Sequence, residues 1–161
     1  MQPAPSVTRD AYFPHWHQTV LTGAALAAAL EAFGASASIA VAELMDAVVR
    51  WNRGPLGHLA GHPLRDERGT LRAGDILKLI TGSRRNYDAV LLDIDNGPDG
   101  LTQPSNEWLY GGAGLAAIAQ ALRPGGVLAL WSATDDAPFT KRLRTAGFAA
   151  TTHRVRARAS G

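Results

Sequence analysis

The chain has 161 residues, of which 46% are hydrophobic and 19% are charged, and these proportions are typical of one folded domain rather than of a disordered tail. Its formal net charge of +2 is too small to predict nucleic-acid binding. The absence of cysteine excludes a disulfide scaffold, a thiolate nucleophile and cysteine-bound zinc, and it fits a reducing, cytoplasmic environment.

The first part of the chain lacks a regular pattern. Residues 1–18 contain three prolines and three aromatic residues without periodicity, so we expect an irregular arm before a single domain at 19–161. His15 and His17 form a His-x-His pair with no third ligand in view, and we predict no metal site. Nothing in the first ten residues resembles a signal peptide, and polar residues interrupt the alanine-rich stretch at 20–42, so we expect no membrane association.

From residue 20 onward, short apolar runs alternate with helical patterns. The expected strands are a very short one at 20–21 and others at 38–42, 70–73, 89–92 and 127–131, and the expected helices are 24–33, 45–51, 76–80, 115–122 and 137–146. A long loop is expected at 97–110, and residues 149–157 alternate weakly, as in an edge or antiparallel strand. This alternation predicts a three-layer α/β/α domain with a mostly parallel sheet and an antiparallel C-terminal strand.

The run from Ala89 to Leu92 is the most informative strand. Four consecutive apolar residues indicate a strand buried on both faces, as in the middle of a parallel sheet. Two carboxylates, Asp93 and Asp95, follow directly, and Asn96-Gly97-Pro98 then favours a turn. Ligands of open α/β sheets bind at the carboxyl ends of the strands, where these acids would lie. The alternative is that Asp93 only caps a turn and Asp95 is only solvated.

Three successive predicted strands are followed by an acid. Because parallel strands end at the same edge, Glu43, Asp75 and Asp93 should lie together there. A carboxylate after the second strand is suited to bind a ribose diol, since it can accept hydrogen bonds from two hydroxyl groups. Asp75, preceded by Gly74, could accept a hydrogen bond from an adenine amine, and Asp93 would face the reactive part of the ligand. The pattern predicts a nucleoside site.

The same stretches resemble a known family. Residues 87–93 and 109–128 are similar to the fourth and fifth strands, with the helix between them, of class I S-adenosylmethionine-dependent transferases. Within that superfamily, residues 41–44, 47–56 and 93–98 resemble motifs of the spermidine synthase-like branch. The resemblance covers roughly residues 20–157 and implies a Rossmann-like fold.

The resemblance also implies roles for individual residues. Glu43 would bind the ribose hydroxyls and Asp75 the adenine amine, within a cofactor site made of Gly23, Glu43, Gly74, Asp75, Ile76 and Asp93. Asp93 matches the position of a catalytic aspartate, and Asp95 could share its role. Asn96 and Tyr110 are the expected substrate-binding residues. The implied cofactor is S-adenosylmethionine or its decarboxylated form, and the implied reaction transfers an aminopropyl or methyl group to a small acceptor such as an amine or polyamine.

The chain departs from the family at its Gly-rich loop. Gly23 stands at the expected spacing, 20 residues before Glu43, but Ala24-Ala25-Leu26 follows it where glycines would admit the ligand. An alternative is therefore an inactive or truncated Rossmann domain that serves as a nucleoside-binding or interaction module. Assembly as a homodimer is possible under either interpretation.

Overall fold

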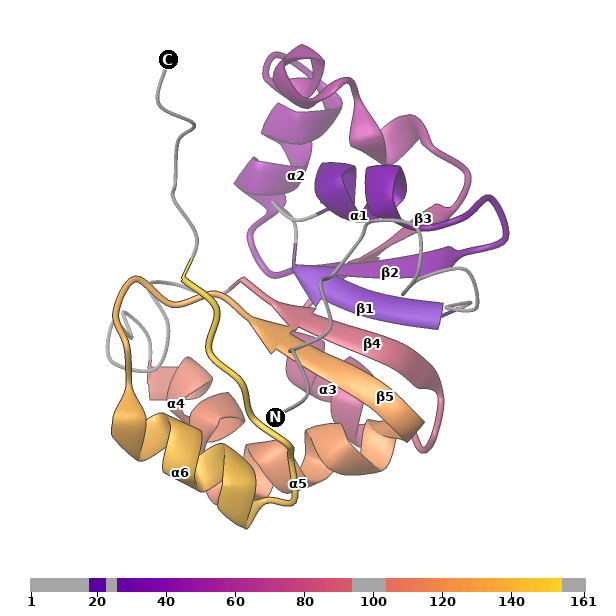
Figure 1. Ribbon diagram of the computed structural model, residues 1–161. Helices are drawn as coiled ribbons and strands as arrows, with labels where there is room; N and C mark the ends of the chain where they lie inside the picture. The colour runs from indigo at the N-terminus through magenta and orange to yellow at the C-terminus, as the bar shows by residue number, and fades with distance from the viewer. Residues whose placement is uncertain (1–17, 23–25, 94–103, 155–161) are drawn as a thin grey trace.

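The computed structural model describes residues 18–22, 26–93 and 104–154, and in these parts strands and helices alternate along the chain (Figure 1). The strands are β1 (Gln18–Thr22), β2 (Ser38–Glu43), β3 (Gly69–Ala73), β4 (Tyr87–Leu92) and β5 (Leu122–Leu130). The α-helices are α1 (Leu26–Ala32), α2 (Asp46–Arg53), α3 (Ile76–Thr81), α4 (Pro104–Tyr110), α5 (Gly112–Ala121) and α6 (Ala137–Thr145), and two short 3₁₀ helices are η2 (Gly57–Ala60) and η3 (Pro63–Arg65).

The strands form one five-stranded sheet in the order β3-β2-β1-β4-β5. Every pairing in it is parallel, so all five carboxyl ends lie at one edge. Helices cover both faces of the sheet, α1 and α2 on one and α3, α5 and α6 on the other (Figure 1). The prediction of a three-layer, mostly parallel α/β domain is confirmed.

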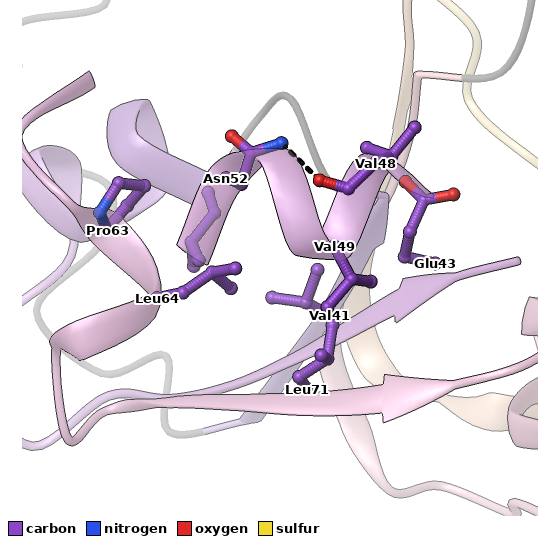
Figure 2. A pocket seen from close by; sticks show the side chains of 9 residues that line it. Val41, Glu43, Val48, Val49, Asn52, Pro63, Leu64 and Leu71 are labelled. Carbon is purple, nitrogen blue, oxygen red and sulfur yellow. Dashed lines mark hydrogen bonds between the residues drawn. The ribbon is translucent and has the colours of Figure 1, made fainter. Parts of the chain in front are cut away.

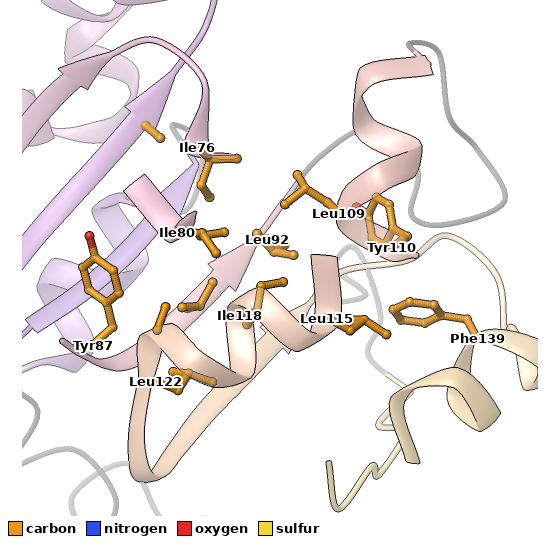
Figure 3. Packing of buried hydrophobic residues seen from close by; sticks show 13 residues of the cluster. Ile76, Ile80, Tyr87, Leu92, Leu109, Tyr110, Leu115, Ile118, Leu122 and Phe139 are labelled. Carbon is orange, nitrogen blue, oxygen red and sulfur yellow. The ribbon is translucent and has the colours of Figure 1, made fainter. Parts of the chain in front are cut away.

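The two faces of the sheet carry separate apolar clusters. The larger cluster joins β4 to α3, α4, α5 and α6 (Figure 3), and its fully buried side chains include Ile80, Leu115 and Ile118. The smaller cluster joins α1 to β2 and centres on Leu26 and Ile39, both fully buried. Residues of β4 contact both layers, as its nearly continuous apolar sequence predicts.

The first strand is longer and more central than its sequence suggests. β1 spans five residues and pairs with both β2 and β4. The expectation of a strand limited to 20–21 is therefore wrong, and Gln18 belongs to the sheet rather than to the arm. Polar residues at both ends of this strand conceal it, because the buried-strand pattern depends on an unbroken apolar run.

Two other local predictions are corrected. The region expected to be loop at 97–110 contains the helix α4. The stretch Arg123-Pro124-Gly125-Gly126 lies within β5 rather than before it, and the register with β4 shifts there. Gly125 has a φ of 81°, and Pro lacks a ladder donor, so both fit an irregularity in a strand at the sheet edge.

The C-terminal region differs from the predicted antiparallel strand. Residues 149–154 run without secondary structure and are paired with no described strand, whereas 155–157 lie outside the described residues. A weak alternation cannot make a strand without a partner to complete its hydrogen bonds. Within the described part of the chain, no helix is long and apolar enough to cross a membrane.

Candidate functional site

The carboxyl edge of the sheet brings together the acids that the sequence singles out. Glu43 ends β2, Asp75 follows β3 after one glycine, and Asp93 follows β4 directly. Across this edge their order is Asp75, Glu43, the end of β1, and then Asp93. Neighbouring strands lie roughly 4.8 Å apart, so the backbones at Glu43 and Asp93 are separated by roughly 10 Å. That span suits a nucleoside with a reactive group at one end.

Glu43 is held by the chain that follows it. Its Oε1 accepts a hydrogen bond of 2.9 Å from the backbone N–H of Met45, which fixes the carboxylate at the start of α2. Its backbone carbonyl accepts a hydrogen bond of 3.0 Å from Gly74 N–H, which ties the ends of β2 and β3 together. Oε2 has no hydrogen-bond partner among the described residues. A half-buried carboxylate with one fixed and one available oxygen is suited to accept hydroxyl groups.

Beside Glu43 lies a small cavity under α2 (Figure 2). Its volume is about 20 Å³, and its walls come from α1, β2, β3, α2 and η3. The lining residues are Leu26, Val41, Glu43, Val48, Val49, Asn52, Pro63, Leu64 and Leu71. A space of this size holds one water molecule at most. This cavity is therefore too small to hold a nucleoside.

The segment after β3 turns sharply into α3. Gly74 has a φ of 131°, a conformation that side chains with a Cβ rarely adopt. Asp75 is the N-cap of α3, and its Oδ1 accepts a hydrogen bond of 2.8 Å from Leu77 N–H. Ile76 is 6% exposed and packs in the larger cluster. Oδ1 of Asp75 thus caps the helix, which leaves Oδ2 as the oxygen available to a ligand.

Asp93 lies where pairing between β4 and β5 ends. The last bond across that pair joins Trp131 N–H to the carbonyl of Leu92 at 3.1 Å. Asp93 is the next residue, and its side chain is exposed at the edge. Its neighbour Leu92 is 2% exposed, so the base of this carboxylate is anchored in the core.

The remaining predicted site residues have different outcomes. Gly23, Asp95 and Asn96 lie outside the described residues. Tyr110 is 3% exposed at the end of α4, and its ring packs edge-on against Phe139 with centroids 5.6 Å apart. This position favours a packing role, and substrate contact by Tyr110 stays a prediction. Within the described ranges, no group of three His, Asp or Glu side chains could hold a metal ion.

The structure adds two apolar residues to the site. Leu44 and Met45 follow Glu43 directly and are 58% and 55% exposed. Exposed aliphatic surface beside a carboxylate is suited to pack against a flat, apolar part of a ligand. The sequence signal was available, because two large apolar residues stand between the strand and the helix where neither element buries them.

The strand order, the parallel pairings and the helices on both faces define a Rossmann-like α/β fold of the class I methyltransferase type. The chain is similar in structure to a spermidine synthase in complex with the transition state analogue AdoDATO, with a TM-score of 0.63 at 15% identity over 83% of this chain and 47% of that one. It is also similar to the spermidine synthase from Thermotoga maritima, with a TM-score of 0.62 at 15% identity over 83% and 46% of the two chains.

A weaker likeness is to the glycopeptide N-methyltransferase MtfA complexed with S-adenosyl-L-methionine, with a TM-score of 0.48 at 18% identity over 74% and 48% of the two chains. The chain spans less than half the length of each of these proteins. No family model matches the sequence. No curated protein sequence matches it either.

Proposed function

We propose that this chain is a spermidine synthase-like transferase that binds S-adenosylmethionine or its decarboxylated form at the carboxyl edge of the sheet. The observation that carries the proposal is the arrangement of Asp75, Glu43 and Asp93 in that order at the ends of β3, β2 and β4. The similar fold of two spermidine synthases, one of them in complex with AdoDATO, supports it. The acceptor is an amine or another small nucleophile.

Different site residues contact different parts of the ligand. The available oxygen of Glu43 accepts from the ribose hydroxyls, and that of Asp75 accepts from the exocyclic adenine amine. Leu44 and Met45 supply apolar surface for the base. Asp93 stands two strands from Glu43, on the other side of β1, and so faces the group that is transferred.

The bound sulfonium supplies an electrophilic carbon. The acceptor nitrogen forms a bond to that carbon as the carbon–sulfur bond breaks, and the bonding pair leaves with sulfur, which becomes a neutral thioether. The nitrogen must arrive deprotonated and in line with the breaking bond. Asp93 orients the amine, accepts its proton and passes it to solvent, to which its side chain is exposed. The same steps describe aminopropyl and methyl transfer.

The second candidate is a nucleoside-binding or interaction module that performs no transfer. It is favoured by the short connection between β1 and α1, which has three residues and one glycine, followed by the fully buried Leu26. A short connection with little glycine leaves limited backbone for close approach to a ligand. The two candidates differ in turnover and share the binding site.

The first experiment separates ligand binding from folding at Glu43. We expect Glu43→Ala to weaken binding of S-adenosylmethionine or its decarboxylated form by roughly 10-fold to 100-fold, because a charge-assisted hydrogen bond contributes about 1.5–3 kcal/mol. Titration calorimetry measures the affinity, and thermal unfolding verifies the fold. Glu43→Gln is the matched control. It keeps one acceptor oxygen, so its affinity for the ligand should lie between that of the parent and that of Glu43→Ala. Unchanged affinity in Glu43→Ala would place the ligand elsewhere.

The second experiment separates binding from turnover at Asp93. In Asp93→Asn we expect turnover with a diamine acceptor to fall by about 10²-fold to 10⁴-fold, the contribution typical of a general base. Affinity for the sulfonium ligand should stay within a few-fold of the parent. Equal turnover in the two proteins contradicts the role of Asp93. Ligand binding without turnover in either protein favours the binding module.

A further inference from the structure

The carboxyl edge of the sheet continues beyond Asp93 to the end of β5, where an aromatic residue stands. Leu92 pairs with Leu130, and the N–H of Trp131 donates a hydrogen bond of 3.1 Å to the carbonyl of Leu92. The next positions on the two strands, Asp93 and Trp131, are therefore neighbours with backbones roughly 4.8 Å apart. The indole of Trp131 is 44% exposed and belongs to neither apolar cluster.

The side chains of Glu43, Asp93 and Trp131 share one face of the sheet. Successive side chains in a strand alternate between the two faces. The leucines that precede Asp93 and Trp131 both pack in the larger cluster, so these two side chains point to the opposite face. Val41 belongs to the smaller cluster on that opposite face, and Glu43, two residues later, points there as well. The row across the edge is thus Glu43, the end of β1, Asp93 and Trp131, and it spans roughly 14 Å.

Trp131 ends a row of exposed apolar side chains along β5. Val127, Ala129 and Trp131 alternate with the buried leucines and so share the face of Asp93, and we call these three residues the β5 stripe. Val127 is 40% exposed, and Ala129 is exposed too. On this face the smaller cluster reaches Leu91 of β4 and includes no residue of β5. Exposed apolar residues that gather beside a binding edge are typical of a contact surface, whereas scattered ones are ordinary.

The charge around the β5 stripe distinguishes between kinds of amine. In the stretches 89–93 and 127–131, which form this end of the two strands, Asp93 is the only charged residue. A linear diamine carries a second ammonium group, which needs a second carboxylate when it leaves water. An amine attached to a flat, apolar body needs only one carboxylate and an apolar surface beside it. Asp93 and the β5 stripe supply these two features next to each other.

We propose that the acceptor is an amine carried on a flat, apolar body, such as an arylalkylamine, and that Trp131 binds this body. The inference rests on the proposed function, because it places the acceptor on the side of Asp93 that faces away from Glu43. The aromatic ring of the acceptor stacks on the indole of Trp131, and Val127 and Ala129 extend the contact. The nitrogen lies at Asp93. It bonds to the carbon of the sulfonium, sulfur leaves as a thioether, and Asp93 accepts the proton that the nitrogen loses.

The test is calorimetric titration of the chain with phenylethylamine and with diaminobutane, each in the presence and absence of methylthioadenosine. Methylthioadenosine is a thioether that cannot donate a group, so binding is measured without turnover. Phenylethylamine should bind about tenfold more tightly than diaminobutane, because an aromatic contact and its buried apolar area contribute on this order. Trp131→Ala should remove this preference, and Trp131→Phe, which keeps an aromatic ring, should retain most of it.

Trp51→Ala is the matched control. Trp51 is also an exposed tryptophan, at 51%, but it lies on α2 rather than at the end of β5. Its replacement should leave the affinities for both amines unchanged. Thermal unfolding verifies that each variant keeps the fold, which the exposure of both indoles favours.

Two results overturn the proposal. One is a parent chain that binds diaminobutane as tightly as phenylethylamine, or that binds no phenylethylamine at millimolar concentration. The other is a preference for phenylethylamine that Trp131→Ala leaves unchanged, because the ring would then bind elsewhere. Failure of the proposed function gives a different result. A chain that binds phenylethylamine through Trp131 but binds neither methylthioadenosine nor either sulfonium ligand would refute the nucleoside site and keep the amine site.

Discussion

The two faces of the sheet are packed differently. The larger cluster contains 13 buried residues of the described chain and fixes α3, α5 and α6 against β4 and β5. The smaller cluster contains six, and α2 on the same face has no buried residue and an exposed Trp51. The candidate ligand acid Glu43 stands at the start of this loosely packed helix. One face therefore provides the rigid support, and the other can adjust to a ligand.

This difference separates stability from function in the molecule. Asp75 and Asp93 are anchored by Ile76 and Leu92, which belong to the larger cluster. Glu43 follows Ala42 of the same cluster, and the backbone N–H groups of Met45 and Gly74 hold it in addition. Substitutions beneath Asp75 and Asp93 should thus unfold the protein, whereas substitutions around Glu43 should change binding with little loss of stability.

The largest expected effect is on the well-packed face. Ile118→Ala should lower the free energy of unfolding by about 3 kcal/mol, because the side chain is fully buried and its loss leaves a cavity. Val49→Ala in α2 should cost about 1 kcal/mol, because two half-buried methyl groups are lost. Urea unfolding measures both. Equal losses in the two variants would contradict the contrast between the faces.

The sequence was sufficient for the fold class and for the acids, because both follow from local patterns. Apolar runs that end in Glu43 or Asp93 predict buried strands with acids at one edge, and the structure has them there. The length of β1 could not be predicted from the sequence. Its terminal residues are polar, and they belong to the strand because β1 pairs with β2 on one side and β4 on the other. It also missed α4, where seven residues beginning with Pro104 are too few to show a helical period.

Non-local pairing explains the remaining differences. The irregularity near Gly125 depends on the register between β4 and β5, which a single strand's sequence does not contain. The predicted antiparallel strand at the C-terminus is a second example. Residues 149–154 pair with no described strand, and their sequence alone does not reveal whether a partner lies beside them. The site could be predicted as a set of acids, but the fixed oxygen of Glu43 and the capping bond of Asp75 required coordinates.

An intermediate effect is expected where α4 meets α5. A Cβ at Gly114 would collide with the backbone of Trp108 and Leu109, so Gly114→Ala should cost about 2 kcal/mol through overpacking. Gly112→Ala in the same helix is the matched control, because nothing lies within 4 Å of its Cβ position. That variant should be neutral or more stable by up to about 1 kcal/mol, since alanine favours helix. Thermal unfolding distinguishes them, and similar losses would refute close packing there.

The smallest effect concerns a polar clamp on the loosely packed face. Arg68 binds Asp66 at 2.8 Å and the carbonyl of Phe33 at 3.0 Å, which joins the start of β3 to the end of α1. Hydrogen bonds from Arg68 lower the pKa of Asp66 from 3.8 to about 2. A lowered pKa stabilises the fold above pH 3.8, and this contribution is lost as the pH falls from 3.8 toward 2.

Arg68→Ala should therefore return the pKa of Asp66 toward 3.8. The contribution of Asp66 to the pH dependence of stability between pH 3.8 and 2 should then disappear. Its midpoint of thermal unfolding at neutral pH should fall by less than that of Gly114→Ala, because the pair is partly exposed. Carboxyl chemical shifts followed by NMR report the pKa directly. A pKa of Asp66 that is unchanged in Arg68→Ala would assign the shift to another cause.

The most direct test of the central claim, that the acids at the carboxyl edge form a nucleoside site, is calorimetric titration of the parent chain. S-adenosylmethionine, its decarboxylated analogue and methylthioadenosine are titrated separately at neutral pH. Our account predicts micromolar binding of at least one of them, and the preferred ligand would identify the transferred group. The absence of binding by all three at millimolar concentration would contradict it and would leave a fold that holds these acids without using them.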